Sequence, residues 1–144
     1  MTSPIESTFE GLHDPDALPQ LNDVNRPYFA AAARGELIFQ RCANGHPFLY
    51  PRLLCPTCHS QDLTWETSAG AGEVITYAPV HRPPWNSFPR HGPYLIVLVR
   101  LDDGAQLLSS LENVPLDEVV IGQRVRAAFE HVSEEIGLVR FLPA

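Results

Sequence analysis

The sequence is short of positive charge and contains no long apolar run. Its 144 residues include 10 Lys and Arg against 17 Asp and Glu, which gives a formal net charge of −7. Affinity for nucleic acids depends mainly on cationic side chains that neutralise phosphates, so this balance argues against a nucleic-acid binder. No stretch approaches the roughly 18 apolar residues of a membrane-spanning helix, which argues against a membrane protein.

The beginning of the sequence also lacks the features of an export signal. Residues 1–6 contain no basic side chain, and no apolar segment follows them, so we expect a cytoplasmic protein. Hydrophobic residues still make up 44% of the chain, which is enough for a folded core. The length suits one domain, or one domain with a small satellite.

The second half of the sequence has the composition of short strands. The run 94–101 is the most apolar of the expected strands, with Arg100 as its one charged residue, which predicts burial on both faces. Asp102-Asp103-Gly104 predicts a hairpin turn after it. A single helical turn is expected at 115–119, between the third and fourth strands. Five antiparallel strands in this order fit an OB-type barrel. The expected strands cover residues 73–80, 94–101, 106–111, 124–130 and 138–142.

The first half divides into shorter segments. Residues 1–24 show no helical or strand period, which indicates an extended arm that is ordered only where it packs on other residues, with a frayed terminus as the alternative. Residues 25–36 favour a helix that Asn25 or Arg26 caps, with Pro27 in its first turn and Gly35 at its end. A short strand at 37–40 opens a zinc-ribbon segment at 37–66, and the glycine-rich stretch 68–72 links it to the OB-fold domain at 67–144. The predicted fold class is therefore mainly β, with an N-terminal helix, a zinc ribbon and a five-stranded barrel.

Cysteine is scarce, but its spacing is informative. Of three cysteines, Cys55 and Cys58 form a C-x-x-C, and Cys42 precedes His46 in a C-x₃-H. Two such pairs, separated by the length of a hairpin, can supply the four ligands of a closed zinc site. The predicted ligands of a structural Zn²⁺ are Cys42, His46, Cys55 and Cys58, with His59 as a weaker alternative. A metal-free ribbon and a redox-active C-x-x-C remain the competing interpretations.

The sequence contains no arrangement typical of a catalytic centre. The G-x-S-x-G, H-E-x-x-H and Walker A motifs are absent, and all three cysteines belong to the predicted metal site. The histidines outside that site are scattered through expected loops and strand ends. We therefore predict no catalytic residues.

The segment 81–93 combines four prolines with aromatic and basic side chains. Prolines stiffen a loop before binding, and Trp and Arg are common interface anchors. This composition favours a partner or ligand surface, and a loop that only caps the barrel is the alternative. Together with two aromatic residues of the expected helix, the predicted contacts with a partner or acyl-CoA are Tyr28, Phe29, His81, Arg82, Trp85, Phe88 and Arg90.

An ordered series of short motifs extends over residues 26–143, and the order is more specific than any one motif. In this order the chain resembles the DUF35 family, which combines a rubredoxin-like zinc ribbon with an acyl-CoA-associated OB-fold domain. The motifs are Arg-Pro-Tyr-Phe at 26–29, Gly-Glu-Leu at 35–37, Arg-Cys at 41–42, Pro-Arg at 51–52, Cys-Pro-Thr-Cys-His-Ser at 55–60, Trp65, Gly-Ala-Gly-Glu-Val at 70–74, Val-His-Arg at 80–82, Pro-Tyr at 93–94, Leu-Val at 98–99, Ile-Gly at 121–122, Val125 and Phe-Leu-Pro at 141–143.

The resemblance implies a non-catalytic scaffold subunit of a thiolase-superfamily complex that processes acyl-CoA. Family members accompany acyltransferases, thiolases and aldolases that shorten steroid side chains. The implied partner is a thiolase-like enzyme subunit, with a hydratase as a second candidate and acyl-CoA at the shared surface. The sequence departs from the family pattern at Gly45, where a second cysteine is usual, and His46 is the expected substitute. His59 likewise replaces a common glycine.

Two other functions remain open at this stage. A stand-alone acyl-CoA-binding protein would need no enzyme partner. A single-stranded nucleic-acid binder would suit an OB-fold, although the net charge argues against it.

Overall fold

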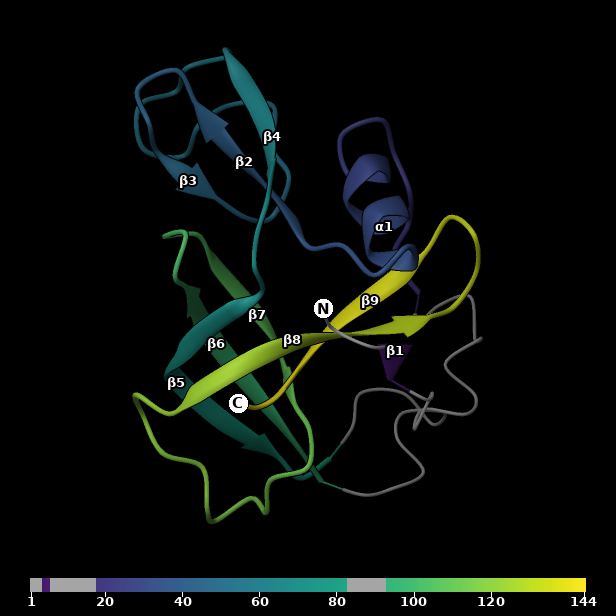
Figure 1. Cartoon of the computed structure of the whole chain (residues 1–144), viewed down its shortest axis with the longest axis vertical. Coiled ribbons are helices and arrows are strands. Elements are labelled where there is room, and N and C mark those ends of the chain that lie inside the picture. The colour runs from purple at the N-terminus through teal and green to yellow at the C-terminus, as the bar shows by residue number, and fades with distance from the viewer. Residues whose placement is uncertain (1–3, 6–17, 83–92) are drawn as a thin grey trace.

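The computed structural model describes residues 4–5, 18–82 and 93–144, and Figure 1 shows a three-stranded module above a barrel, with a helix beside both. The segments in chain order are β1 (Pro4–Ile5), α1 (Arg26–Ala33), β2 (Ile38–Cys42), β3 (Pro47–Phe48), β4 (Leu63–Thr67), β5 (Ala71–Val80), β6 (Tyr94–Leu101), β7 (Gln106–Leu111), β8 (Arg124–His131) and β9 (Gly137–Pro143).

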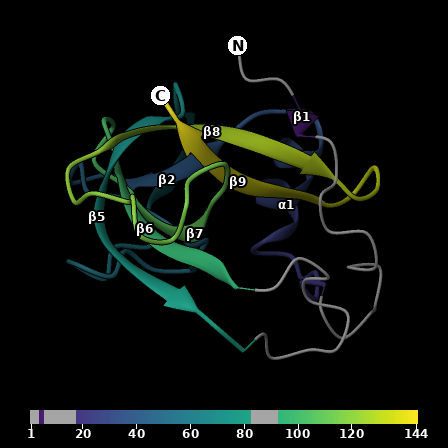
Figure 2. The ribbon, with the colours of Figure 1, turned by 90° about the horizontal axis from the view of Figure 1, so that it is seen from below.

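The larger sheet closes on itself. Its strand order is β1-β8-β5-β6-β7-β9, and β8 also pairs with β9, so the five strands β5 to β9 form a barrel. Figure 2 shows these strands arranged around a common core. Strands β2, β3 and β4 form a separate antiparallel sheet in the order β3-β2-β4. This mainly β architecture, with a ribbon before a five-stranded barrel, confirms the predicted fold class.

Strand β6 departs from the expectation of burial on both faces. Its inward side chains Leu95, Val97, Val99 and Leu101 are at most 1% exposed. The alternate positions are only partly buried, and Arg100 is exposed. The prediction was wrong because the barrel covers one face of β6, whereas the other lies on the outside of the sheet. Among the described residues, an apolar outer face is therefore only partly covered.

Helix α1 ends where the sequence predicts. The N–H groups of Gly35 and Glu36 donate to the carbonyls of Ala32 and Ala31, at 3.0 and 2.9 Å. Gly35 has a φ of +79°, so the two bonds form a Schellman motif that satisfies the last carbonyls. Asn25 occupies the N-cap position, but its side chain does not cap the helix.

The turns also follow the sequence closely. Gly104 donates its N–H to the Leu101 carbonyl at 2.9 Å and has a φ of +103°, which confirms the hairpin predicted at 102–104. The segment at 115–119 contains a hydrogen-bonded turn rather than a helix, closed by the N–H of Glu118 on the Pro115 carbonyl. The expected linker 68–72 is shorter in the structure, because Ala71 and Gly72 already belong to β5.

The hydrophobic core of the barrel extends to α1. Tyr28, Phe29 and Ala32 of the helix pack in one cluster with residues of β5 to β9. A second, small cluster lies in the ribbon and contains Cys42, Phe48 and Cys55. Within the described part of the chain, no helix has the length and apolarity that a membrane crossing requires.

Candidate metal centre

Four potential ligands meet at one end of the ribbon. Cys42 is the last residue of β2, His46 comes just before β3, and Cys55 and Cys58 lie in the connection from β3 to β4. Each pair is held by a tight turn, in which Gly45 donates to the Cys42 carbonyl and His59 to the Cys55 carbonyl, both at 2.9 Å. Such turns place the two side chains of each pair side by side.

Each of the two ligand turns contains one residue with a positive φ. Gly45 has a φ of +88° and His59 a φ of +62°. A glycine adopts this left-handed region without strain, so Gly45 lets the chain reverse before His46. His59 follows Cys58 directly, and its backbone closes the second turn while its side chain is exposed. His59 is not part of the four-residue cluster.

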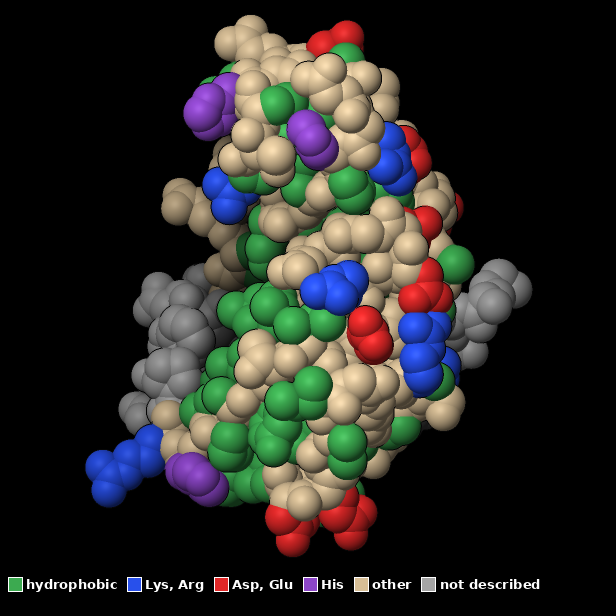
Figure 3. Space-filling view, turned by 90° about the vertical axis from the view of Figure 1, so that its left-hand side faces the viewer, with side chains coloured by type: hydrophobic (Ala, Val, Ile, Leu, Met, Phe, Trp, Pro, Cys, Tyr) green, Lys and Arg blue, Asp and Glu red, His purple; other side chains and the backbone are tan. Residues whose placement is uncertain are grey.

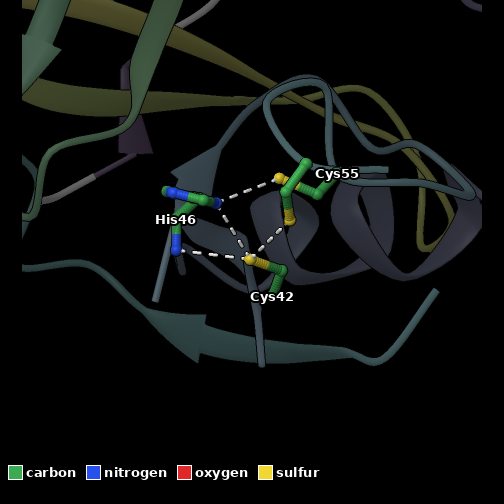
Figure 4. A group of neighbouring side chains, drawn as sticks. Cys42, His46 and Cys55 are labelled. Carbon is green, nitrogen blue, oxygen red and sulfur yellow. Dashed lines mark hydrogen bonds between the residues drawn. The ribbon is translucent and has the colours of Figure 1, made fainter. Parts of the chain in front are cut away.

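The separations within the cluster match the edges of a metal tetrahedron. Zn–S distances of about 2.3 Å and Zn–N distances of about 2.0 Å imply S···S edges of roughly 3.8 Å and S···N edges of roughly 3.5 Å. The Cys42 and Cys58 sulfurs are 3.7 Å apart. His46 Nδ1 lies 3.4 Å from the Cys42 sulfur and 3.6 Å from the Cys55 sulfur, and Figure 4 shows its ring edge directed at both. All four ligand atoms lie within 4.8 Å of one another, so the cluster is positioned to bind a metal ion.

Backbone and side-chain donors surround the sulfurs. The N–H groups of His46 and Thr57 each point at a cysteine sulfur at 3.4 Å. Asn44 donates its side-chain N–H to the Cys58 sulfur at 3.3 Å, and this bond is the main cause that lowers the pKa of the Cys58 thiol to about 6. Burial raises the pKa of the Cys42 thiol. Because thiolates bind zinc, the Asn44 side chain favours the ligand form of Cys58.

The predicted partner contacts divide into three groups. Tyr28 and Phe29 are 2% and 9% exposed, so they pack in the core and offer little surface. His81 and Arg82 are exposed after the end of β5. Trp85, Phe88 and Arg90 lie outside the described residues. A role for these seven residues as contacts stays a prediction.

Sequence reasoning missed an apolar groove between the ribbon and the barrel. A cavity of about 470 Å³ lies between Tyr28 and Tyr50 on one side and the strands β6, β7 and β9 on the other. The rings of Tyr28 and Tyr50 meet edge to face, with centroids 5.4 Å apart. The hydrophobic outer positions of β6 were the signal for this groove, because they need cover from outside the barrel. The remaining lining residues are Phe29, Tyr94, Ile96, Leu108, Ser109, Ser110, Leu138, Val139 and Arg140.

Two family models match adjoining parts of the chain. The model of the rubredoxin-like zinc ribbon domain of ChsH2 matches residues 29–64, and that of the C-terminal OB-fold domain of ChsH2 matches residues 65–130. The first range contains all four clustered ligands. The match and the geometry together identify zinc as the metal for which this ribbon is suited.

Known proteins are similar over most of the chain. A DUF35 domain-containing scaffold protein of Pyrococcus furiosus is 34% identical over 107 residues, which are 73% of this chain and 78% of the relative. A probable enoyl-CoA hydratase alpha subunit of Thermomonospora curvata is 36% identical over 132 residues, or 88% of this chain. The chain spans only 39% of the length of that second relative.

Two solved structures share the fold. A chain of the Ltp2-ChsH2(DUF35) aldolase is 33% identical, with a TM-score of 0.75 over 88% of this chain and 98% of that one. A DUF35-family protein of unknown function from Sulfolobus solfataricus is 17% identical, with a TM-score of 0.58 over 85% of this chain and 87% of that one, which supports the fold alone. From these matches and the ribbon-plus-barrel architecture, the chain belongs to the DUF35 family.

Proposed function

We propose that this chain is a non-catalytic scaffold subunit of a thiolase-superfamily complex that processes acyl-CoA. The observation that carries the proposal is the similarity to the DUF35 chain of the Ltp2-ChsH2(DUF35) aldolase, whose name includes a second component, Ltp2. That similarity extends over nearly the whole of the DUF35 chain. The catalytic residues of the complex would then belong to the thiolase-like partner, and a hydratase is a second candidate partner.

The metal centre supports a structural role. Cys42, His46, Cys55 and Cys58 would fill all four positions of a tetrahedral zinc ion, which leaves no open position for a catalytic water. Zinc bound in this way contributes to folding of the ribbon. The proposed organisation is an arm at 1–24, a helix at 25–36, the zinc ribbon at 37–66 and the OB-fold domain at 67–144.

Co-expression with a thiolase-like enzyme from the same organism tests the proposal. We expect the two chains to co-purify as a stable complex that converts an acyl-CoA substrate, and we expect the isolated chain to convert none. Failure to associate with any thiolase-like enzyme of that organism would contradict the scaffold role. Thioester turnover by the pure chain would contradict the assignment of catalysis to the partner.

A stand-alone acyl-CoA-binding protein is the second candidate. The groove of about 470 Å³ lies in the size range of small-molecule sites. Calorimetric titration of the isolated chain with a short-chain acyl-CoA distinguishes the two functions. Saturable binding without a partner would favour the second candidate.

A further inference from the structure

Residues 50–54, between the second and third metal ligands, carry several large hydrophobic side chains on the surface. Tyr50, Leu53 and Leu54 are 46%, 74% and 39% exposed. Solvent-exposed leucines occur singly on many proteins, but three exposed hydrophobic residues within five positions form a patch. We name this segment the ribbon loop.

A buried glutamine holds the ribbon loop in place. Gln40 of β2 is only 6% exposed, and its amide bonds to both backbone groups of Arg52. The Arg52 N–H donates to Gln40 Oε1 at 2.7 Å, and Gln40 Nε2 donates to the Arg52 carbonyl at 3.1 Å. The paired bonds fix the loop before any partner arrives, so little conformational entropy is lost on binding.

The groove connects the ribbon loop to the outer face of the barrel. Tyr50 lines the cavity opposite Ile96 and Leu108, and Leu108 is itself 54% exposed. Cross-strand pairing places Leu98 beside Leu108 on this outer face. Hydrophobic side chains gather on the barrel part of the face shown in Figure 3. Tyr50 belongs to both the ribbon loop and the groove, so through this residue the ribbon loop adjoins the groove and the outer face of β6 and β7.

The charge at the ribbon loop indicates the chemistry of the occupant. Six arginines of the described chain, 26, 34, 41, 100, 124 and 140, each pair with a carboxylate. The exposed side chains of Arg52, Arg82 and Arg126 make no ion pair within the described residues, and of these three only Arg52 lies in the ribbon loop. An unpaired cation at the centre of an apolar loop suits a protein surface that has an apolar segment next to an Asp or Glu.

We infer that the ribbon loop and the groove dock the enzyme subunit, which inserts an apolar segment into the groove and places a carboxylate against Arg52. This inference rests on the proposed function and locates its interface. The proposed interface is a different surface from the loop 81–93, which the sequence alone favours as the contact surface. A few residues of an interface usually carry most of its affinity, and Leu53 and Leu108 are the two most exposed hydrophobic side chains of this surface, so they are the residues to test.

The experiment uses the thiolase-like enzyme that co-purifies with the wild-type chain. Leu53→Ser and Leu108→Ser are each expected to weaken its binding about tenfold or more. Arg52→Glu is expected to weaken binding and to reduce its dependence on salt. Ile121→Ser is the matched control, since Ile121 is 64% exposed in the connection between β7 and β8, and it is expected to change the Kd less than about twofold. Thermal melts and zinc content confirm that each variant is folded.

The possible outcomes distinguish a failure of the proposed interface from a failure of the proposed function. If the wild-type chain binds the enzyme and Leu53→Ser and Leu108→Ser bind equally well, this surface is not the interface, although the scaffold role stands. If no thiolase-like enzyme binds the wild-type chain, the scaffold role itself fails. Self-association of the wild-type chain that Leu53→Ser abolishes would assign the surface to a second copy. Binding of a short-chain acyl-CoA that Leu108→Ser abolishes, with enzyme binding unchanged, would assign the groove to a small molecule.

Discussion

Gly137 of β9 lies directly against Ala32 of α1. A Cβ atom at position 137 would overlap the carbonyl carbon of Ala32 and the nitrogen of Ala33. The helix can approach the barrel this closely because glycine has no side chain. The contact fixes the helix on the barrel, and the helix in turn supports one side of the groove through Tyr28.

Gly137→Ala is therefore expected to destabilise the protein by about 2–3 kcal/mol, because backbone atoms cannot move aside as a flexible side chain can. Urea unfolding monitored by circular dichroism measures this loss. Gly122→Ala is the control, since a Cβ atom there meets open space but the backbone has a φ of +87°. The control should cost about 1 kcal/mol, from conformational strain alone. Equal losses for the two variants would show that the helix contact tolerates a methyl group.

The zinc site gives a prediction about ligand identity. His46→Ala is expected to bind less than one equivalent of zinc and to melt at a lower temperature, because ribbon folding and metal binding are coupled. Cys55→Ser and chelation should have the same effect. His59→Asn is the control, because Asn also tolerates the positive φ of this position, and it should retain one zinc. Elemental analysis measures the zinc content of each variant, and thermal melts measure its stability. Full zinc occupancy in His46→Ala would exclude this histidine as a ligand.

Asn44 provides a separate test of the metal surroundings. Asn44→Ala removes the hydrogen bond to the Cys58 sulfur but leaves all four ligands, so zinc should still bind, with an affinity about tenfold or more lower. Competition with a chromophoric chelator measures the affinity. An unchanged affinity would mean that the Asn44 bond does not contribute to the metal site.

The sequence was sufficient for features that depend on local pattern. The hairpin at 102–104 and the end of α1 follow from glycine positions, and the ligand cluster follows from cysteine and histidine spacing. Features that depend on distant segments were not predictable in the same way. Gln40 lies 12 positions from Arg52, and no sequence pattern relates an amide in a strand to a loop backbone. The two-sided burial expected for 94–101 was wrong because the hydrophobicity of a run does not show which segments of the fold pack against each face of the strand.

The pair between Asp102 and Arg124 gives a dependence on pH. Both carboxylate oxygens accept from the guanidinium, at 2.8 and 2.7 Å, and these bonds lower the pKa of Asp102 from its ordinary value of 3.8. A lowered folded-state pKa means that the contribution to stability is complete above 3.8 and is lost as the pH falls through the lower folded-state value.

Asp102→Asn should accordingly be less stable than the wild type at neutral pH, and the difference should disappear in acid. Asp117→Asn is the control, because Asp117 is exposed and makes no ion pair in the described chain. Urea unfolding at a series of pH values measures both. A difference that persists unchanged below the folded-state pKa would show that the pair does not stabilise the fold through its charge.

Glu130 and Arg140 form a second pair in a different environment. Their side chains are 4% and 12% exposed, and Arg140 Nη2 lies 3.1 Å from Glu130 Oε2. Glu130→Gln and Arg140→Met each remove one member of this ion pair at a largely buried position, so each is expected to cost about 3–5 kcal/mol. The double variant should cost clearly less than the sum of the two, because the loss of their mutual attraction is counted in both single variants. Urea unfolding of the four proteins completes the cycle. Additive losses would show that the two charges do not depend on each other.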